Sequence, residues 1–170
     1  MRDFPAEGVA WAGVQGDLRL ADLLFIAQKA NRIAPLQLVR ADRVVGADHL
    51  RSAAMHARRA FDEGRNHADR LEVEFTRYLA GERQIRRALD KMGLPDKPRA
   101  VIVVAFGEKR ADTITYFLEN LGYPETEGLE AASEGKLSAF GVTEAALEAT
   151  PEERRLDLAL EAVAQVDLLH

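Results

Sequence analysis

Apolar positions along the chain fall into short runs that alternate between strand-like and helix-like spacing. Residues 9–14 form a first apolar run, and residues 36–39 form a second in which apolar and polar positions alternate. Residues 101–106 are continuously apolar and mostly β-branched, which is typical of a central strand covered on both faces. These three segments predict at least three strands.

Between and after these strands, apolar residues recur at helical spacing. Glycines at the ends of several of these segments are typical helix terminators. The string Thr150-Pro-Glu-Glu153 predicts a capping box that starts the last helix, with proline at its first position. The predicted helices cover about six segments: residues 17–30, 48–63, 69–80, 82–92, 108–121 and 150 to near the end of the chain.

In two of these helices the spacing assigns particular residues to the core. The helix after the first strand is expected to have Asp17 as its N-cap and to bury Leu24 and Phe25. The helix from residue 82 is expected to bury Ile85 and Leu89, with its basic residues on the opposite face.

Strands interleaved with helices predict an α/β fold. We expect a single domain over residues 1–170, in which about six helices flank a small central mixed sheet of three or more strands. No internal repeat, low-complexity tract or linker divides the chain. The strand order does not follow from the pattern.

Composition narrows the class of protein further. The chain is 47% hydrophobic and 30% charged, as in globular proteins, and its lack of cysteine excludes disulfides, thiol catalysis and cysteine-based metal sites. No apolar run reaches the roughly 18 residues of a membrane span. The first five residues also lack the apolar core of a signal peptide. We therefore expect a cytoplasmic protein without membrane contact.

Charge is distributed unevenly along the chain. The net charge of −5 argues against indiscriminate coating of nucleic acid. However, residues 119–170 have a net charge of −9 and residues 1–118 have a net charge of +4, so a local basic site is not excluded. Nine arginines lie within 40 residues of each other: Arg51, Arg58, Arg59, Arg65, Arg70, Arg77, Arg83, Arg86 and Arg87.

No local catalytic pattern accompanies this charge. The turn Gly13-Val-Gln-Gly16 lies between a strand and a helix, where phosphate loops are found, but it lacks the third glycine or the Gly-Lys-Ser/Thr ending of such loops. His49 and His56 are seven residues apart, a poor spacing for a metal chelate. We expect no enzyme activity, catalytic residue, metal, cofactor or small-molecule substrate. A nucleotide-binding α/β enzyme domain that uses the glycine turn is the alternative.

The arginines near residue 85 have a spacing that suggests a contact surface. Arg83, Arg86, Arg87 and Lys91 follow an i, i+3, i+4, i+8 pattern and share one face of a helix. Arginine forks hold phosphates with two hydrogen bonds. Contact with nucleic acid or phosphate is one interpretation of this face, and an ordinary solvated surface is the other.

The segment that contains these arginines also resembles a known family. Residues 56–68 contain Asn-x-Ala, residues 71–78 read Leu-Glu-x-x-x-x-x-Tyr, and residues 81–85 read Gly-x-Arg-Gln-Ile. This pattern resembles the small regulatory subunit of the KEOPS complex, in the archaeal type of the PRPK-binding-protein-like family. The resemblance is strongest over residues 48–106 and weaker elsewhere, including residues 140–147.

This chain departs from the family pattern in the helical segment just before Tyr78. The family has a run of aliphatic residues there, and Glu74, Thr76 and Arg77 interrupt it in this chain. The packing of that helix is therefore open.

The resemblance implies a non-catalytic accessory subunit that binds the KEOPS kinase/ATPase subunit and tRNA, notably the 3′ CCA end. Such a subunit supports threonylcarbamoyladenosine modification of tRNA at position 37. Binding a tRNA end requires phosphate clamps and a slot for unstacked bases. The candidate tRNA-binding residues are Arg58, Arg59, Arg65, Asn66, Arg77, Arg83, Gln84, Arg86 and Arg87.

Several alternatives stay open at the level of the sequence. Asn66 is a candidate cap of the following helix as well as a candidate RNA contact. For the kinase, we expect the apolar face of the helix from residue 48 or of the last helix to make the contact. A purely structural adaptor without RNA contact is a further alternative.

Overall fold

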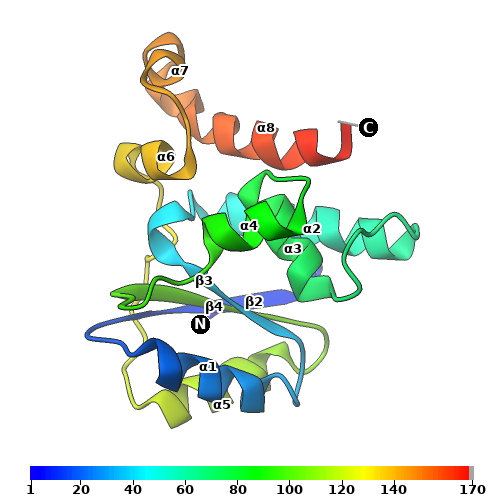
Figure 1. The fold of residues 1–170 in the computed structure, drawn as a ribbon, viewed down its shortest axis with the longest axis vertical. Helices are drawn as coiled ribbons and strands as arrows, with labels where there is room; N and C mark the ends of the chain where they lie inside the picture. The colour runs from blue at the N-terminus through cyan, green and yellow to red at the C-terminus, as the bar shows by residue number, and fades with distance from the viewer. Residues whose placement is uncertain (169–170) are drawn as a thin grey trace. The chain divides into compact units, whose positions relative to one another are not determined.

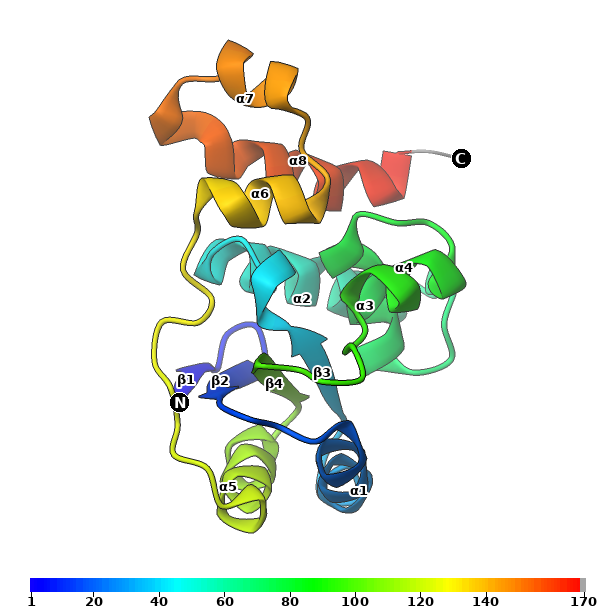
Figure 2. The same ribbon diagram turned by 60° about the vertical axis from the view of Figure 1, so that its left-hand side comes forward.

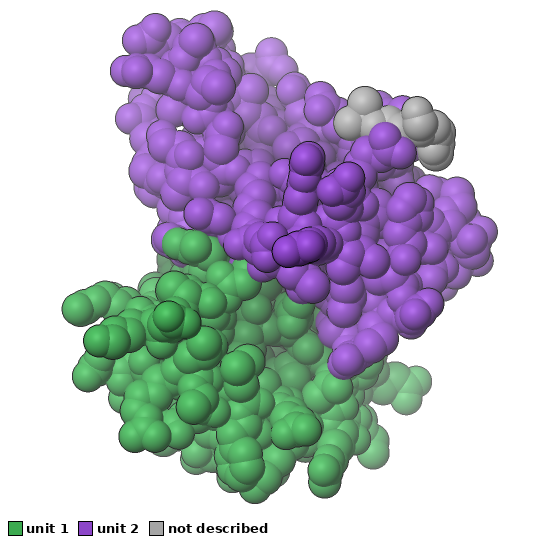
Figure 3. Space-filling model, viewed as in Figure 1, with its two compact units in different colours: residues 1–41, 93–129 green, residues 42–92, 130–170 purple. Residues whose placement is uncertain are grey.

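The structure is a computed structural model that describes residues 1–168. In this range it contains four β-strands and eight α-helices (Figures 1 and 2), so the predicted α/β class is confirmed. Residues 1–41 and 93–129 form one compact unit, and residues 42–92 form another with the segment from residue 130 onward (Figure 3).

The strands of the first unit form one sheet in the order β1-β2-β4-β3. Each neighbouring pair of strands is antiparallel, so the expectation of a mixed sheet is wrong. The expectation of three or more strands is confirmed. A helical crossover makes β2 and β3 run in the same direction, but β4 is inserted between them in the opposite direction. The strands are β1 (Arg2–Phe4), β2 (Val9–Gln15), β3 (Leu36–Arg40) and β4 (Ala100–Phe106).

Two helices, α1 (Leu20–Ala30) and α5 (Arg110–Leu121), lie side by side on one face of this sheet (Figure 2). α1 starts at residue 20, with Arg19 rather than Asp17 at its N-cap. Its buried stripe is Leu23, Ile26 and Ala30, which pack in one cluster with residues of the sheet. The expected burial of Leu24 and Phe25 is wrong, because these residues lie outside that stripe and are 54% and 58% exposed.

The second unit is helical. α2 packs against α3 and α8, and α3 also packs against α4 and α8. Small buried residues on α2, among them Ala53, Ala57 and Ala60, allow close approach of its neighbours. The helices are α2 (Ala47–Asp62), α3 (Leu71–Ala80), α4 (Ile85–Met92), α6 (Glu134–Phe140), α7 (Glu144–Ala149) and α8 (Arg155–Leu168).

The start of the last helix differs from the prediction. Thr150 is the C-cap of the short helix α7, and the following residues Glu152–Arg154 form a 3₁₀ turn before α8 begins. The predicted capping box is therefore wrong, because Thr150 already ends one helix. Side-chain caps occur instead at Ser133 and Thr143, which start α6 and α7, two helices that the apolar spacing did not predict.

The buried side of α4 also differs. Arg83 and Gln84 precede the helix, so its buried residues are Ala88 and Met92. Leu89 is 40% exposed and Ile85 is half-buried, so their expected burial in the core is wrong.

Candidate functional site

The string that the sequence placed between a strand and a helix lies mostly in the strand, because Gly13 is inside β2 and Gly16 directly follows it. Both glycines are used for close packing. A Cβ added to Gly13 would lie 2.5 Å from the carbonyl oxygen of Thr126 and 2.8 Å from Cδ1 of Leu129. A Cβ on Gly16 would lie 2.7 Å from the ring of Tyr123. Because residues 123–129 occupy the space beside both glycines, these glycines are explained without a phosphate, and the main support for a nucleotide-binding loop is lost.

His49 is a packing residue. It is fully buried, accepts a hydrogen bond at Nδ1 from the backbone N–H of Val45 (3.0 Å), and is 2.9 Å through Nε2 from the carbonyl of Leu79. These contacts fit a neutral ring that carries its proton on Nε2. Burial lowers the pKa of His49 from 6.5 to about 4, so the ring is neutral near pH 7.

Within residues 1–168, no three His, Asp or Glu side chains are grouped so that they could hold a metal ion. In the same range, none of the helices combines the length and the apolar character that crossing a membrane requires.

The polar residues that interrupt the apolar sequence of α3 find hydrogen-bond and ion-pair partners inside the second unit. Glu74 is fully buried and forms an ion pair with Arg77, which is 2% exposed. The Thr76 hydroxyl donates to the carbonyl of Glu72 at 2.8 Å. α3 is therefore buried on nearly all sides, and a buried ion pair replaces part of the aliphatic packing that the family pattern has there.

Glu74 also organises the loop before α3. Its Oε2 accepts hydrogen bonds from the backbone N–H groups of His67 (3.1 Å) and Ala68 (2.8 Å). The Asn66 side chain donates to the carbonyl of Ala68 at 2.9 Å. Asn66 does not cap the next helix, because α3 has Arg70 at its N-cap; it shapes the loop instead.

Arg77 positions the turn between α3 and α4. Its Nε donates to the carbonyl of Arg83 at 2.9 Å, while its NH1 is paired with Glu74. A guanidinium that is buried and engaged in this way is not accessible to a phosphate, so we leave Arg77 out of any RNA-binding surface.

Four side chains converge on the carboxylate of Asp167, on the last turn of α8. Tyr78 (2.5 Å) and Arg65 (3.2 Å) donate to Oδ1, whereas His56 (2.9 Å) and Arg59 (3.3 Å) contact Oδ2. Desolvation raises the pKa of Asp167, but hydrogen bonds from Tyr78, His56 and Arg65 outweigh it and lower the pKa to about 2. Asp167 is therefore ionised at neutral pH.

The basic residues around α4 are presented to solvent. Arg83, Gln84, Arg86 and Arg87 are all exposed. Leu89, also exposed, lies one helical turn from the half-buried Ile85, so apolar surface lies on the same short helix as the arginines. Lys91 is more enclosed than the spacing suggested: its amine donates to the carbonyl of Ala80 and lies 3.8 Å from the Phe140 ring centroid.

A cavity of about 650 Å³ lies in the second unit beside this helix. Its charged lining residues are Arg43, Glu82 and Lys91, and Phe140 and Leu158 contribute apolar surface. Arg43 donates through NH1 to the carbonyl of Lys91 at 2.5 Å. The Nε of Arg43 is buried and has no hydrogen-bond partner in the described part of the chain. The cavity therefore combines positive charge with apolar surface.

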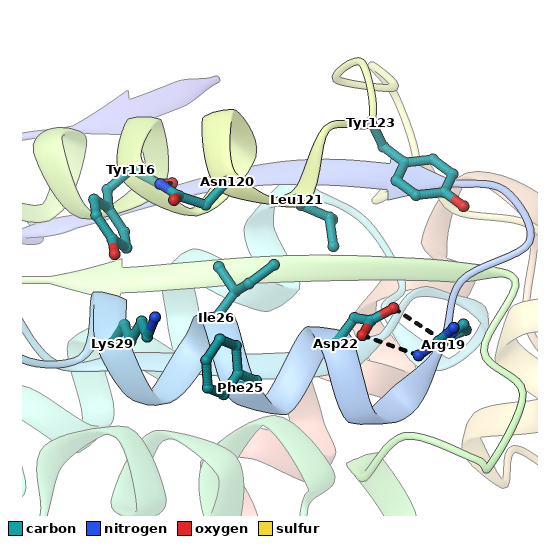
Figure 4. A pocket seen from close by; sticks show the side chains of 9 residues that line it. All are labelled: Arg19, Asp22, Phe25, Ile26, Lys29, Tyr116, Asn120, Leu121 and Tyr123. Carbon is teal, nitrogen blue, oxygen red and sulfur yellow. Dashed lines mark hydrogen bonds and ion pairs between the residues drawn. The ribbon is translucent and has the colours of Figure 1, made fainter.

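A smaller pocket of about 330 Å³ lies between α1 and α5 in the first unit (Figure 4). Phe25 and Lys29 line it from α1, Tyr116 lines it from α5, and Ile26 and Leu121 form part of its apolar wall. The amine of Lys29 lies 4.2 Å from the Phe25 ring centroid. None of the nine predicted tRNA-binding residues lines this pocket.

The nine predicted tRNA-binding residues fall into separate groups. Arg83, Gln84, Arg86 and Arg87 lie together at α4, Arg59 and Arg65 meet at Asp167, and Arg58 is exposed on α2. Asn66 shapes its loop and Arg77 is buried, as described above.

Sequence reasoning did not find the roles of Asp167, Tyr78 and Arg43. Asp167 is one of twelve acids in a strongly acidic segment, so nothing in the local sequence distinguishes it. Tyr78 belongs to the family motif, and that position was a usable signal.

The comparison with known families agrees with the family resemblance of the central segment. No curated protein matches the chain. A family model, described as kinase binding protein CGI-121, matches residues 18–138, more than two thirds of the chain. This range contains β3, β4 and all of α1 to α5. The chain therefore belongs to the CGI-121 family of kinase-binding proteins, the KEOPS regulatory-subunit family whose motifs its central segment carries.

Proposed function

We propose that this protein is a cytoplasmic, non-catalytic subunit of a KEOPS complex that binds both the complex's kinase/ATPase subunit and the 3′ CCA end of tRNA. In this role it supports threonylcarbamoyladenosine modification of tRNA at position 37, while its partners perform the chemistry. The observation that carries the proposal is the match to a kinase-binding family over residues 18–138.

The kinase is the first proposed partner. The apolar stripes of α2 and α8, which the sequence favoured as the kinase contact, are occupied by packing within the second unit: Leu50 and Ala57 on α2 and Val163 on α8 are fully buried. The contact must then use outward-facing residues. Among the described residues, large exposed apolar side chains include Leu24 and Phe25 on α1 and Met55 on α2.

Transfer RNA is the second proposed partner, and the surface around α4 supports it. Arg83, Arg86 and Arg87 supply bidentate donors for phosphates from a rigid helix and the turn before it. Leu89 and Ile85 supply apolar surface on which an unstacked base can lie. Arg58, Arg59 and Arg65 extend the positive charge along α2 and the following loop.

The cavity beside α4 supports recognition of a terminal nucleotide. Its volume of about 650 Å³ falls within the range of small-ligand sites. Arg43 and Lys91 contribute positive charge to its lining. A single-stranded end can enter such a recess, which explains how a protein of net charge −5 binds RNA at one place.

Binding of intact tRNA and of tRNA without its CCA end tests the RNA part of the proposal. A filter-binding titration is expected to give a clear loss of affinity for the shortened tRNA. Equal affinities for the two RNAs would rule out recognition of the 3′ end.

Co-purification with the kinase subunit tests the protein partner. The kinase from the same host is expected to elute with this chain in size-exclusion chromatography. A pair of separate peaks at micromolar concentrations would contradict the proposal.

A structural adaptor without RNA contact is the second candidate. Arg59 and Arg65 are already paired with Asp167, and Arg77 is buried, which favours structural roles for these three arginines. Retention of the kinase together with no measurable tRNA binding would select this candidate.

A further inference from the structure

The groups around Asp167 have the composition of a phosphate site. Two guanidinium groups, an imidazole and a phenol hydroxyl from His56, Arg59, Arg65 and Tyr78 all contact one carboxylate at 2.5–3.3 Å. Arginine forks and neutral donors around one anion are the usual means by which proteins hold phosphate oxygens. Asp167 occupies the position of that anion.

The donors and the acceptor come from different parts of the chain. His56 and Arg59 lie on α2, Arg65 lies in the loop after it, and Tyr78 lies on α3, whereas Asp167 lies on the last turn of α8. α2 and α3 pack against each other, so the donors are held together apart from α8. A shift of the last turn of α8 would release the contacts of all four groups to Asp167 without dismantling the elements that carry them. Arg65 would still be held by Glu63, which it contacts at 2.6 Å through NH2 and 2.7 Å through Nε, and would present NH1 to an anion.

The cluster is also open to solvent on its arginine side. The side chains of Arg59 and Arg65 are 55% and 40% exposed, whereas that of Asp167 is 16% exposed. An incoming anion can therefore reach the two arginines before Asp167 leaves.

We propose that His56, Arg59, Arg65 and Tyr78 form a phosphodiester-binding site that Asp167 occupies in the free protein and that an RNA phosphate takes over in the complex. The proposal rests on the proposed tRNA function and adds a regulatory contact to it. Occupation by Asp167 keeps the site from binding stray anions, and RNA must displace the carboxylate to take over its hydrogen bonds with Tyr78, His56 and the two arginines.

Replacing Asp167 with asparagine tests this competition. Asp167→Asn keeps the shape and one oxygen acceptor for Tyr78 but removes the negative charge. We expect the variant to bind tRNA three- to tenfold more tightly. The logarithm of its affinity should also fall more steeply with the logarithm of the salt concentration, by the amount that one or two additional phosphate contacts produce. Inorganic pyrophosphate, titrated in parallel by calorimetry, is expected to bind the variant more tightly than the unchanged protein.

Two controls separate the site from a general charge effect. Glu161→Gln changes the net charge by the same amount at an exposed position of α8 and is expected to leave both affinities unchanged. The background Arg59→Gln/Arg65→Gln is expected to abolish the gain produced by Asp167→Asn. A gain that persists in that background would overturn the proposal.

The outcomes distinguish this proposal from the proposed function. If Asp167→Asn gains affinity for neither probe, the competing-anion site is wrong, whatever the unchanged protein does with tRNA. If it gains affinity for pyrophosphate while no variant binds tRNA, the anion site stands and the tRNA function fails.

A measurement on the unchanged protein covers the case in which Asp167→Asn does not fold. Amide hydrogen exchange in the last described turn of α8 is expected to become faster when tRNA, or pyrophosphate at saturating concentration, is added. Unchanged or slower exchange with a bound probe would overturn the proposal.

Discussion

The hydroxyl of Tyr78 donates a hydrogen bond of 2.5 Å to Oδ1 of Asp167 and thereby joins α3 to the last turn of α8. Burial, and then the hydrogen bond to Asp167, raise the pKa of Tyr78, so the phenol stays protonated at neutral pH. A residue of the family motif is thus tied to an acid almost ninety positions away.

Loss of the Tyr78 hydroxyl should loosen α8. Tyr78→Phe keeps the ring but removes the donor to Asp167, and hydrogen bonds to charged groups contribute about 1.5–3 kcal/mol, so we expect a loss near the lower end of this range. Urea unfolding followed by circular dichroism measures the change. Tyr116→Phe on α5 serves as the matched control and should leave stability within about 0.5 kcal/mol. An unchanged midpoint for Tyr78→Phe would contradict a structural role for the contact.

His49 should make stability depend on pH. Its pKa is about 4 in the folded chain and 6.5 ordinarily, so between these values the unfolded chain binds more protons. The free energy of unfolding should therefore fall as the pH is lowered from 6.5 to 4, with a slope of up to about 1.4 kcal/mol per pH unit from this residue.

His49→Gln should be less stable at pH 7 but show a shallower fall between pH 6.5 and 4. Urea unfolding at several pH values measures both effects. His67→Gln, at an exposed position, should keep the original slope. A slope that is the same with and without His49 would show that the buried ring is not the titrating group.

The buried pair Glu74–Arg77 should be far more sensitive than an exposed pair of equal spacing. Arg77→Met leaves the Glu74 charge buried without its partner, which typically costs about 3–5 kcal/mol. The pair Arg154–Asp157 has the same i, i+3 spacing, but its side chains are 68% and 46% exposed. Arg154→Met should cost less than about 1 kcal/mol. Similar unfolding midpoints for the two variants would contradict the burial argument.

Gly81 should tolerate alanine less well than Gly64. Both have a φ of +65°, which costs a residue with a Cβ roughly 1–2 kcal/mol. A Cβ on Gly81 would in addition lie 3.0 Å from Cβ of Ala162 on α8, whereas Gly64 has open space around it. Thermal unfolding should therefore show a larger loss for Gly81→Ala than for Gly64→Ala. Equal losses would mean that α8 moves away at no cost.

Charge reversal at α4 should weaken tRNA binding. Arg83→Glu/Arg86→Glu removes two exposed cations, so we expect at least a tenfold loss of affinity and a salt dependence shallower by about two contacts. Lys97→Glu/Arg99→Glu changes the net charge equally at exposed positions of the first unit and should have a much smaller effect. Filter binding at several salt concentrations measures both quantities. An unchanged slope for the α4 variant would remove these arginines from the RNA surface.

Local patterns predicted most of the elements but not their faces. The strands at residues 9–14, 36–39 and 101–106 were found because short apolar runs and alternation of apolar and polar residues are local signals of a strand. The buried face of α1 was wrong because the face that packs on the sheet is set by the tertiary contacts of Leu23, Ile26 and Ala30, and the apolar spacing is also compatible with the face of Leu24 and Phe25. The antiparallel pairing of β4 with both neighbours was out of reach, since strand order is set by contacts between distant segments.

In the candidate site, too, the sequence predicted local groupings of residues but not their contacts with distant segments. Arginine spacing identified Arg83, Arg86 and Arg87 as an exposed group, because that group is local. Spacing could not separate Arg77, which is buried against Glu74, from Arg65, which is half-exposed beside Asp167. Arg65 and Arg77 look alike in the sequence until the partner of each guanidinium is known.

The sequence by itself determined the α/β class, the family and the absence of thiol chemistry, because periodicity, short motifs and composition are properties of the chain alone. Only the tertiary structure decided which cations are available to a partner. Residues far apart in the sequence, such as Arg65 and Asp167, neutralise each other only after folding brings their charges to 3.2 Å. The strength of a charge interaction depends on the distance between the charges and on their burial, and the tertiary structure sets both.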